Sequence, residues 1–93
     1  MKIIKKQDIF QLEDWSMDYP GTSYQYEVGC YPTASRSDGS LLWQTVGQKM
    51  RISLTFGTME EAETCYESLT NGEKRIRDYT RNVWDPRTLA YID

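Results

Sequence analysis

The chain has 93 residues, which is enough for one domain and too few for a second hydrophobic core. Eleven basic and fourteen acidic side chains leave a net charge of −3, which argues against a protein that is coated by nucleic acid. No apolar run is long enough to cross a membrane and no signal peptide is visible. We therefore expect a complete, cytoplasmic gene product that begins at Met1.

The first twenty residues contain two competing patterns. Two adjacent isoleucines near the N-terminus can begin a short strand. Asp8 stands where it can cap a short helix, whose apolar side would carry Ile9, Leu12 and Trp15. The sequence thus allows a short N-terminal helix, and Pro20-Gly21 would end any element here.

Residues 22–31 alternate in the manner of a strand with one buried face. Pro32 ends this strand, and a polar loop follows over residues 33–40. Residues 41–46 and 49–56 are again β-prone and are separated by Gly47-Gln48, which suits a two-residue turn. The pattern predicts a hairpin that joins these two strands.

The next stretch predicts the main helix, over about residues 59–70. Thr58 and Glu61 have the spacing of a capping box, and Asn71-Gly72 can supply the left-handed residue that ends a helix. The apolar stripe recurs with helical spacing and consists of Met59, Ala62, Tyr66 and Leu69.

The C-terminal segment reads in two ways. Ile76, Tyr79 and Val83 have helical spacing, whereas residues 79–84 have better strand propensity. We favour the strand, followed by a turn over 85–88 and a returning strand over 89–92.

These elements predict a single α+β domain over residues 1–93. Its sheet would be largely antiparallel, with four or five strands in the order β-β-β-α-β-β, and the main helix would pack on one face. The short N-terminal helix would precede them.

The residue inventory excludes most catalytic chemistry. The chain has no histidine, and its two cysteines, Cys30 and Cys65, cannot hold a structural zinc ion unaided. Buried free thiols are the favoured state of both, and a single bridge between them stays open. We expect no catalytic residue, no metal site and no cofactor, and hence no enzyme. Two or more carboxylates converging in a deep pocket would contradict this expectation.

Aromatic residues are more numerous than one small core can absorb. Three Trp, seven Tyr and two Phe are present, and rings of this kind concentrate binding energy at protein interfaces. Their ordinary role would be to cover the sheet face opposite the helix, and both roles are compatible. The predicted partner-binding residues are the aromatic anchors Tyr24, Tyr31, Trp43 and Trp84 and an acidic rim of Glu60, Glu63 and Glu67.

The favoured function is therefore a protein-interaction module that binds a larger protein, as a steric inhibitor or as an adaptor. Inhibitors and immunity factors of phages and mobile elements, anti-CRISPR proteins among them, are similar in size and acidity, which is an analogy only. A homodimer through the same rings stays open.

The alternative function is binding of single-stranded nucleic acid by the segment 74–87. A charge-paired surface is the more ordinary outcome for such a mixture of charges. The predicted contact residues are Lys74, Arg75, Arg77, Tyr79, Arg81 and Arg87.

Overall fold

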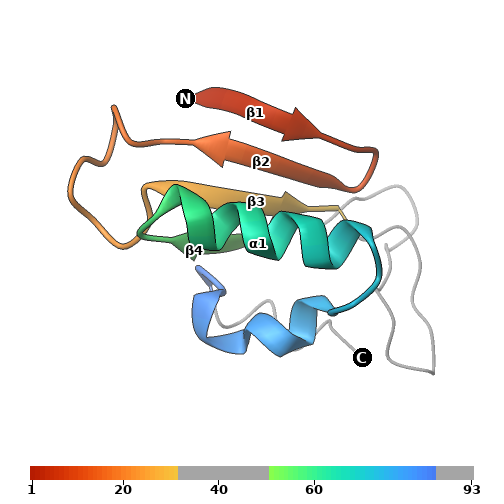
Figure 1. Cartoon of the computed structure of the whole chain (residues 1–93). Helices are drawn as coiled ribbons and strands as arrows, with labels where there is room; N and C mark the ends of the chain where they lie inside the picture. Colours follow the sequence, from red (N-terminus) through yellow and green to blue (C-terminus); the bar gives the residue numbers. More distant parts are fainter. Residues whose placement is uncertain (32–50, 86–93) are drawn as a thin grey trace.

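The structure is a computed structural model and describes residues 1–31 and 51–85. Strands β1 (Lys2–Lys6), β2 (Phe10–Asp14), β3 (Tyr26–Cys30) and β4 (Ile52–Phe56) form an antiparallel sheet in the order β1-β2-β3-β4. Helix α1 (Met59–Thr70) packs across one face of the sheet, and the 3-10 helix η1 (Ile76–Asn82) follows beside β4 (Figure 1). The predicted α+β class with an antiparallel sheet is confirmed.

The hydrophobic core lies between the sheet and α1. Alternate strand residues point toward the helix because successive side chains of a strand project to opposite faces. The apolar stripe of α1 packs against these strand residues. Ile76 of η1 and Val83, which follows η1, are also buried in this core. The buried apolar residues are Phe10, Leu12, Val28, Cys30, Ile52, Leu54, Phe56, Ala62, Cys65, Tyr66, Leu69, Ile76 and Val83.

The predicted main helix is confirmed at both ends. The Thr58 hydroxyl accepts a hydrogen bond from the Glu61 amide at 3.2 Å and donates one to the Glu61 carboxylate at 2.9 Å. At the other end, the Asn71 amide donates to the Glu67 carbonyl at 3.0 Å, and Gly72 has a φ of 80°. The left-handed glycine lets the chain leave the helix without steric cost.

The predicted N-terminal helix is wrong, because residues 2–14 form the β1–β2 hairpin instead. Phe10 and Leu12 are both buried against the core, which the two-residue period of a strand allows. The turn between the strands is closed by the Gln7 amide, which donates to the Phe10 carbonyl at 2.7 Å. Strand β3 is also shorter than the predicted 22–31, so Tyr24 precedes it.

The predicted strand over residues 79–84 is wrong as well, since residues 76–82 form η1. The Asp78 carboxylate accepts from the Arg75 amide at 2.8 Å and starts the helical turn. Burial of Ile76 then holds that turn against the core. The predicted strands 41–46 and 89–92 lie outside the described residues. The order observed in the described part is therefore β-β-β-β-α, followed by η1.

The two outer strands of the described sheet end it in different ways. Strand β1 carries three lysines and an irregular register between Ile3 and Lys5. Residues 82–84 lie along the outer edge of β4, where Val83 forms an isolated antiparallel bridge with Leu54. Nearby, the Trp84 amide donates to the Ser53 carbonyl at 2.9 Å.

Candidate functional site

The candidate site lies on the face of the sheet opposite α1. The register of the central strands places Glu13 opposite Glu27, and Glu27 opposite Thr55. These three residues alternate with core residues, so their side chains project away from the helix. The register therefore brings two carboxylates from separate strands side by side.

Arg51 joins the two carboxylates into a charge cluster, which we define as Glu13, Glu27 and Arg51. One terminal nitrogen of its guanidinium donates to both Glu13 and Glu27. The same guanidinium donates from Nε to the Tyr31 hydroxyl at 2.9 Å. It lies directly over Gly29, where an added Cβ would come within 2.9 Å of the Arg51 Cζ. The absence of a side chain at this glycine permits the close approach.

Burial shifts the pKa of both Glu13 and Arg51 in the charge cluster, and its net effect differs between them. Only 4% of Glu13 is exposed, and this burial raises the pKa of its carboxyl to about 7. A hydrogen bond with Glu27 raises that pKa further, whereas the charge of Arg51 opposes the rise. For Arg51, burial disfavours the charged form, but the bonds to Glu27 outweigh it and raise the pKa of the guanidinium. Burial therefore favours the protonated form of the Glu13 carboxyl.

Beside the charge cluster, four aromatic rings stand in a continuous row. The Trp15 and Tyr19 ring centroids are 5.9 Å apart, and those of Tyr19 and Tyr24 are 5.7 Å apart. Tyr24 and Trp84 continue the row at 5.0 Å, with their planes at 72°. Tilted and edge-to-face pairs of this kind are favourable aromatic contacts.

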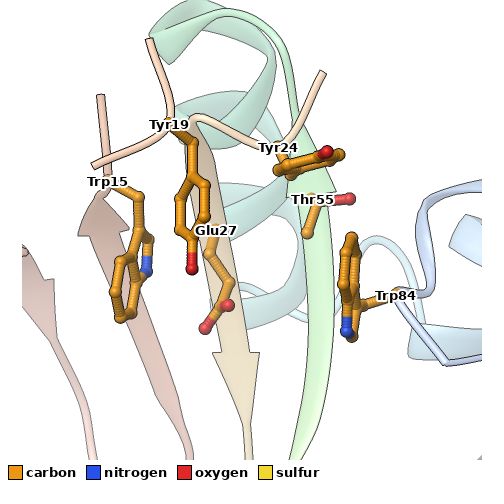
Figure 2. Close-up of a pocket in the computed structure, with 6 residues that line it drawn as sticks. All are labelled: Trp15, Tyr19, Tyr24, Glu27, Thr55 and Trp84. Atoms are coloured by element: carbon orange, nitrogen blue, oxygen red, sulfur yellow. The ribbon is translucent and has the colours of Figure 1, made fainter. Parts of the chain in front are cut away.

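These rings surround a pocket of about 280 Å³, which we call the aromatic pocket. Figure 2 shows Trp15 and Tyr19 on one side, Trp84 on the other, and Glu27 and Thr55 between them on the sheet. Two of the rings are largely open to solvent, since Trp84 is 59% exposed and Tyr19 is 45% exposed. The described residues that line the pocket are Trp15, Tyr19, Tyr24, Glu27, Thr55 and Trp84.

The loop between β2 and β3 positions three of the rings. The Trp15 amide donates to the Gln25 carbonyl at 2.7 Å and extends the hairpin by one pair. The Tyr19 amide donates to the Trp15 carbonyl at 2.9 Å, which closes a turn of the chain. Gly21 has a positive φ, which lets the chain reverse direction after this turn. The Gln25 side chain donates to the Gly57 carbonyl at 3.1 Å and ties the loop to the end of β4.

The structure brings together two of the predicted aromatic anchors, because Tyr24 and Trp84 both line the pocket. Tyr31 lies outside it and contacts Arg51, whose guanidinium is 5.7 Å from the ring centroid. Trp43 lies outside the described residues. The prediction missed Trp15 and Tyr19 as pocket residues.

The predicted acidic rim lies elsewhere, on α1. Glu63 forms an ion pair with Lys5 at 3.6 Å, and Glu67 pairs with the same lysine. Glu60 is exposed at the start of the helix. Because the aromatic pocket is on the opposite face of the sheet, these glutamates do not form its rim.

The predicted nucleic-acid segment does not form a row of arginines beside an open ring. The Tyr79 hydroxyl lies 2.7 Å from the Ser68 hydroxyl, and its ring packs edge-on against Phe56 at 6.1 Å. The Tyr79 ring therefore packs against other residues of the chain and does not form an open face on which a base could stack. Nucleic-acid binding stays a prediction, with exposed charges at Lys74, Arg75, Arg77 and Arg81, while Arg87 lies outside the described residues.

Residues 1–31 and 51–85 contain no group of three or more carboxylates and thiols arranged to hold a metal ion. Cys30 and Cys65 are both buried and free. Over the same ranges, no helix has the length and apolar character that crossing a bilayer requires.

Comparisons with protein-family models, with curated proteins and with solved structures found no match.

Proposed function

We propose that this chain is a non-enzymatic protein-interaction module that binds a larger protein through the aromatic pocket. The observation that carries this proposal is the row of four rings on the sheet face opposite α1, two of which are largely exposed. Trp and Tyr are the residues that most often supply binding energy at interfaces. An exposed group of such rings is a typical feature of a binding surface.

The charge cluster is better suited to structure and recognition than to catalysis. Glu13 and Glu27 do converge, but both are bound by Arg51, and only Glu27 lines the pocket. A general acid or base must reach the substrate within hydrogen-bond distance. Glu13, whose raised pKa would suit that role, lies beneath the surface and away from the pocket lining.

The mechanism we propose is steric. The rings would occupy a surface of the partner and exclude its other ligands, and the charges around them would set orientation. An inhibitor and an adaptor differ in the outcome of this binding. Adding the purified chain at one-to-one stoichiometry would reduce the activity of the partner in the first case only.

The test is affinity capture from native host extract with three baits. The wild-type chain is compared with a Tyr19→Ala, Trp84→Ala double variant, whose changes are at exposed positions, and with an Arg77→Ala, Arg81→Ala control. We expect a stoichiometric partner with wild type and control, and its loss with the aromatic variant. Unchanged capture by a folded aromatic variant would contradict the proposal. Loss with the arginine variant alone would favour the basic segment. Light scattering after size exclusion identifies a homodimer that uses the same rings.

A further inference from the structure

Among the described residues that line the aromatic pocket, one is charged, and it is Glu27. This side chain is 12% exposed, so it is largely desolvated but still reachable from the pocket. In the described part of the chain, cation–π contacts are made by Lys5 on Tyr66 and by Arg51 on Tyr31. Neither of these two cations lies over the four rings of the aromatic pocket.

The charge of the surroundings selects the sign of a ligand. Glu13 and Glu27 share the single guanidinium of Arg51, so carboxyl groups outnumber cations in the charge cluster, and the excess becomes a net negative charge above about pH 7, where Glu13 releases its proton. Aromatic faces are also electronegative. An anion would be repelled by both features, and an apolar group would remove water from Glu27 without replacing its hydrogen bonds. A cation with an apolar stem is attracted by the carboxylate and by the rings, and it can replace the hydrogen bonds that Glu27 loses with water.

We propose that the aromatic pocket binds an arginine side chain of the partner protein, with the guanidinium stacked on the rings and paired with Glu27. This inference rests on the proposed function, because the arginine is taken to come from the partner of the module. The volume of about 280 Å³ suits one side chain rather than a folded segment. The remaining exposed ring surface of Tyr19 and Trp84 would contact the neighbouring residues of the partner.

The chain already contains the same recognition once, outside the aromatic pocket. There, the Arg51 guanidinium lies 5.7 Å from the Tyr31 ring centroid and donates to the Glu27 carboxylate. A carboxylate has enough lone pairs to accept from a second guanidinium. Arginine is favoured over lysine because its planar head stacks on rings and forms several directed hydrogen bonds. Thr55 also lines the pocket.

The experiment uses three short peptides as probes, acetyl-Gly-Arg-Gly-amide and its lysine and citrulline counterparts. Citrulline has the shape of arginine without its charge, so it separates cation recognition from stacking alone. Binding is followed by amide chemical shifts of the full chain and by the fluorescence of its tryptophans. We expect the arginine peptide to bind in the millimolar range and to shift residues 15–27, 55 and 84. The citrulline peptide should bind roughly ten-fold more weakly, with the lysine peptide between them.

Two variants localise the binding. Trp84→Ala changes an exposed ring that is not in the core, so the variant should stay folded and lose binding of the arginine peptide. Thr64→Ala changes an exposed residue of α1, on the opposite face of the sheet from the aromatic pocket. This variant should bind the peptide like wild type.

Equal binding of the arginine and citrulline peptides would overturn the inference, as would shifts confined to the glutamates of α1 or unchanged binding by Trp84→Ala. No detectable binding of any peptide would overturn it too. The proposed function is judged separately by the capture experiment. In one outcome, the Tyr19→Ala, Trp84→Ala variant loses capture of the partner while the arginine peptide fails to bind wild type. That result would support the aromatic pocket as the interaction surface and would refute arginine as its ligand.

Discussion

Replacing Glu13 with glutamine should remove most of the pH dependence of stability near neutral pH. Glutamine has nearly the shape of glutamic acid and can still hydrogen-bond Glu27, but it cannot ionise. Burial raises the pKa of Glu13 to about 7 in the folded chain, compared with the ordinary value of 4.5. Ionising this carboxyl in the folded protein therefore costs free energy that the variant avoids.

The size and sign of the effect follow from proton binding. Between these two pKa values the folded chain holds the proton of Glu13 and the unfolded chain has released it. Stability therefore falls as pH rises through this range, and it levels off above about 7. A pKa difference of about 2.5 corresponds to an upper value of about 3 kcal/mol. The other shifted groups titrate outside this range, since the pKa of Asp14 is lowered and those of both cysteines are raised.

The assay is urea unfolding at pH 5 and at pH 8, followed by tryptophan fluorescence. We expect the wild type to lose about 2–3 kcal/mol between the two pH values and Glu13→Gln to lose much less. Glu73→Gln changes an exposed glutamate and should behave like wild type. Wild-type stability that is flat or rises over this range would refute the reasoning, as would a variant that keeps the full slope.

Three further predictions concern the core and the helix cap. Thr58→Ala removes the N-cap hydroxyl and should lower the unfolding free energy by about 1 kcal/mol, whereas Thr64→Ala, at an exposed position of α1, should change it by less than about 0.5 kcal/mol. Leu54→Ala empties a fully buried position and should cost about 2–5 kcal/mol in denaturant titration, compared with less than about 1 kcal/mol for the exposed Ile3→Ala. Burial raises the pKa of Cys65 to about 12, so a thiol reagent at pH 8 should label both cysteines only after urea is added. Rapid labelling of the folded chain would contradict their burial.

The sequence predicted the elements whose signals are local and agree with one another. Helix α1 combines a capping residue, Thr58, with an apolar stripe and the terminating Gly72, and its bounds were correct. The prediction of a strand over 79–84 failed because it relied on strand propensity, whereas a single side-chain hydrogen bond favours a helical turn there. Asp78 bonds the Arg75 amide and starts a 3-10 turn, which average propensities do not include.

The candidate site was predicted only in part, because it depends on strand register. Tyr24 and Trp84 were identified by residue type. Trp15 was assigned to a predicted helix, whereas it directly follows the second strand of the β1–β2 hairpin. The pairing of Glu13 with Glu27 follows from the β2–β3 register, which a single sequence does not specify. The alternation of Phe10 and Leu12 with polar residues was the signal that could have revealed β2.

The two outer strands of the described sheet also limit how this molecule can be recognised. Strand β1 presents lysines and a bulged register, and residues 82–84 already occupy carbonyls of β4. Both features discourage another chain from adding a strand. Backbone pairing is tolerant of sequence, so if the described edges discourage strand addition, we expect the proposed module to recognise its partner through side chains. The same arrangement should keep the protein from joining edge to edge into fibres at high concentration.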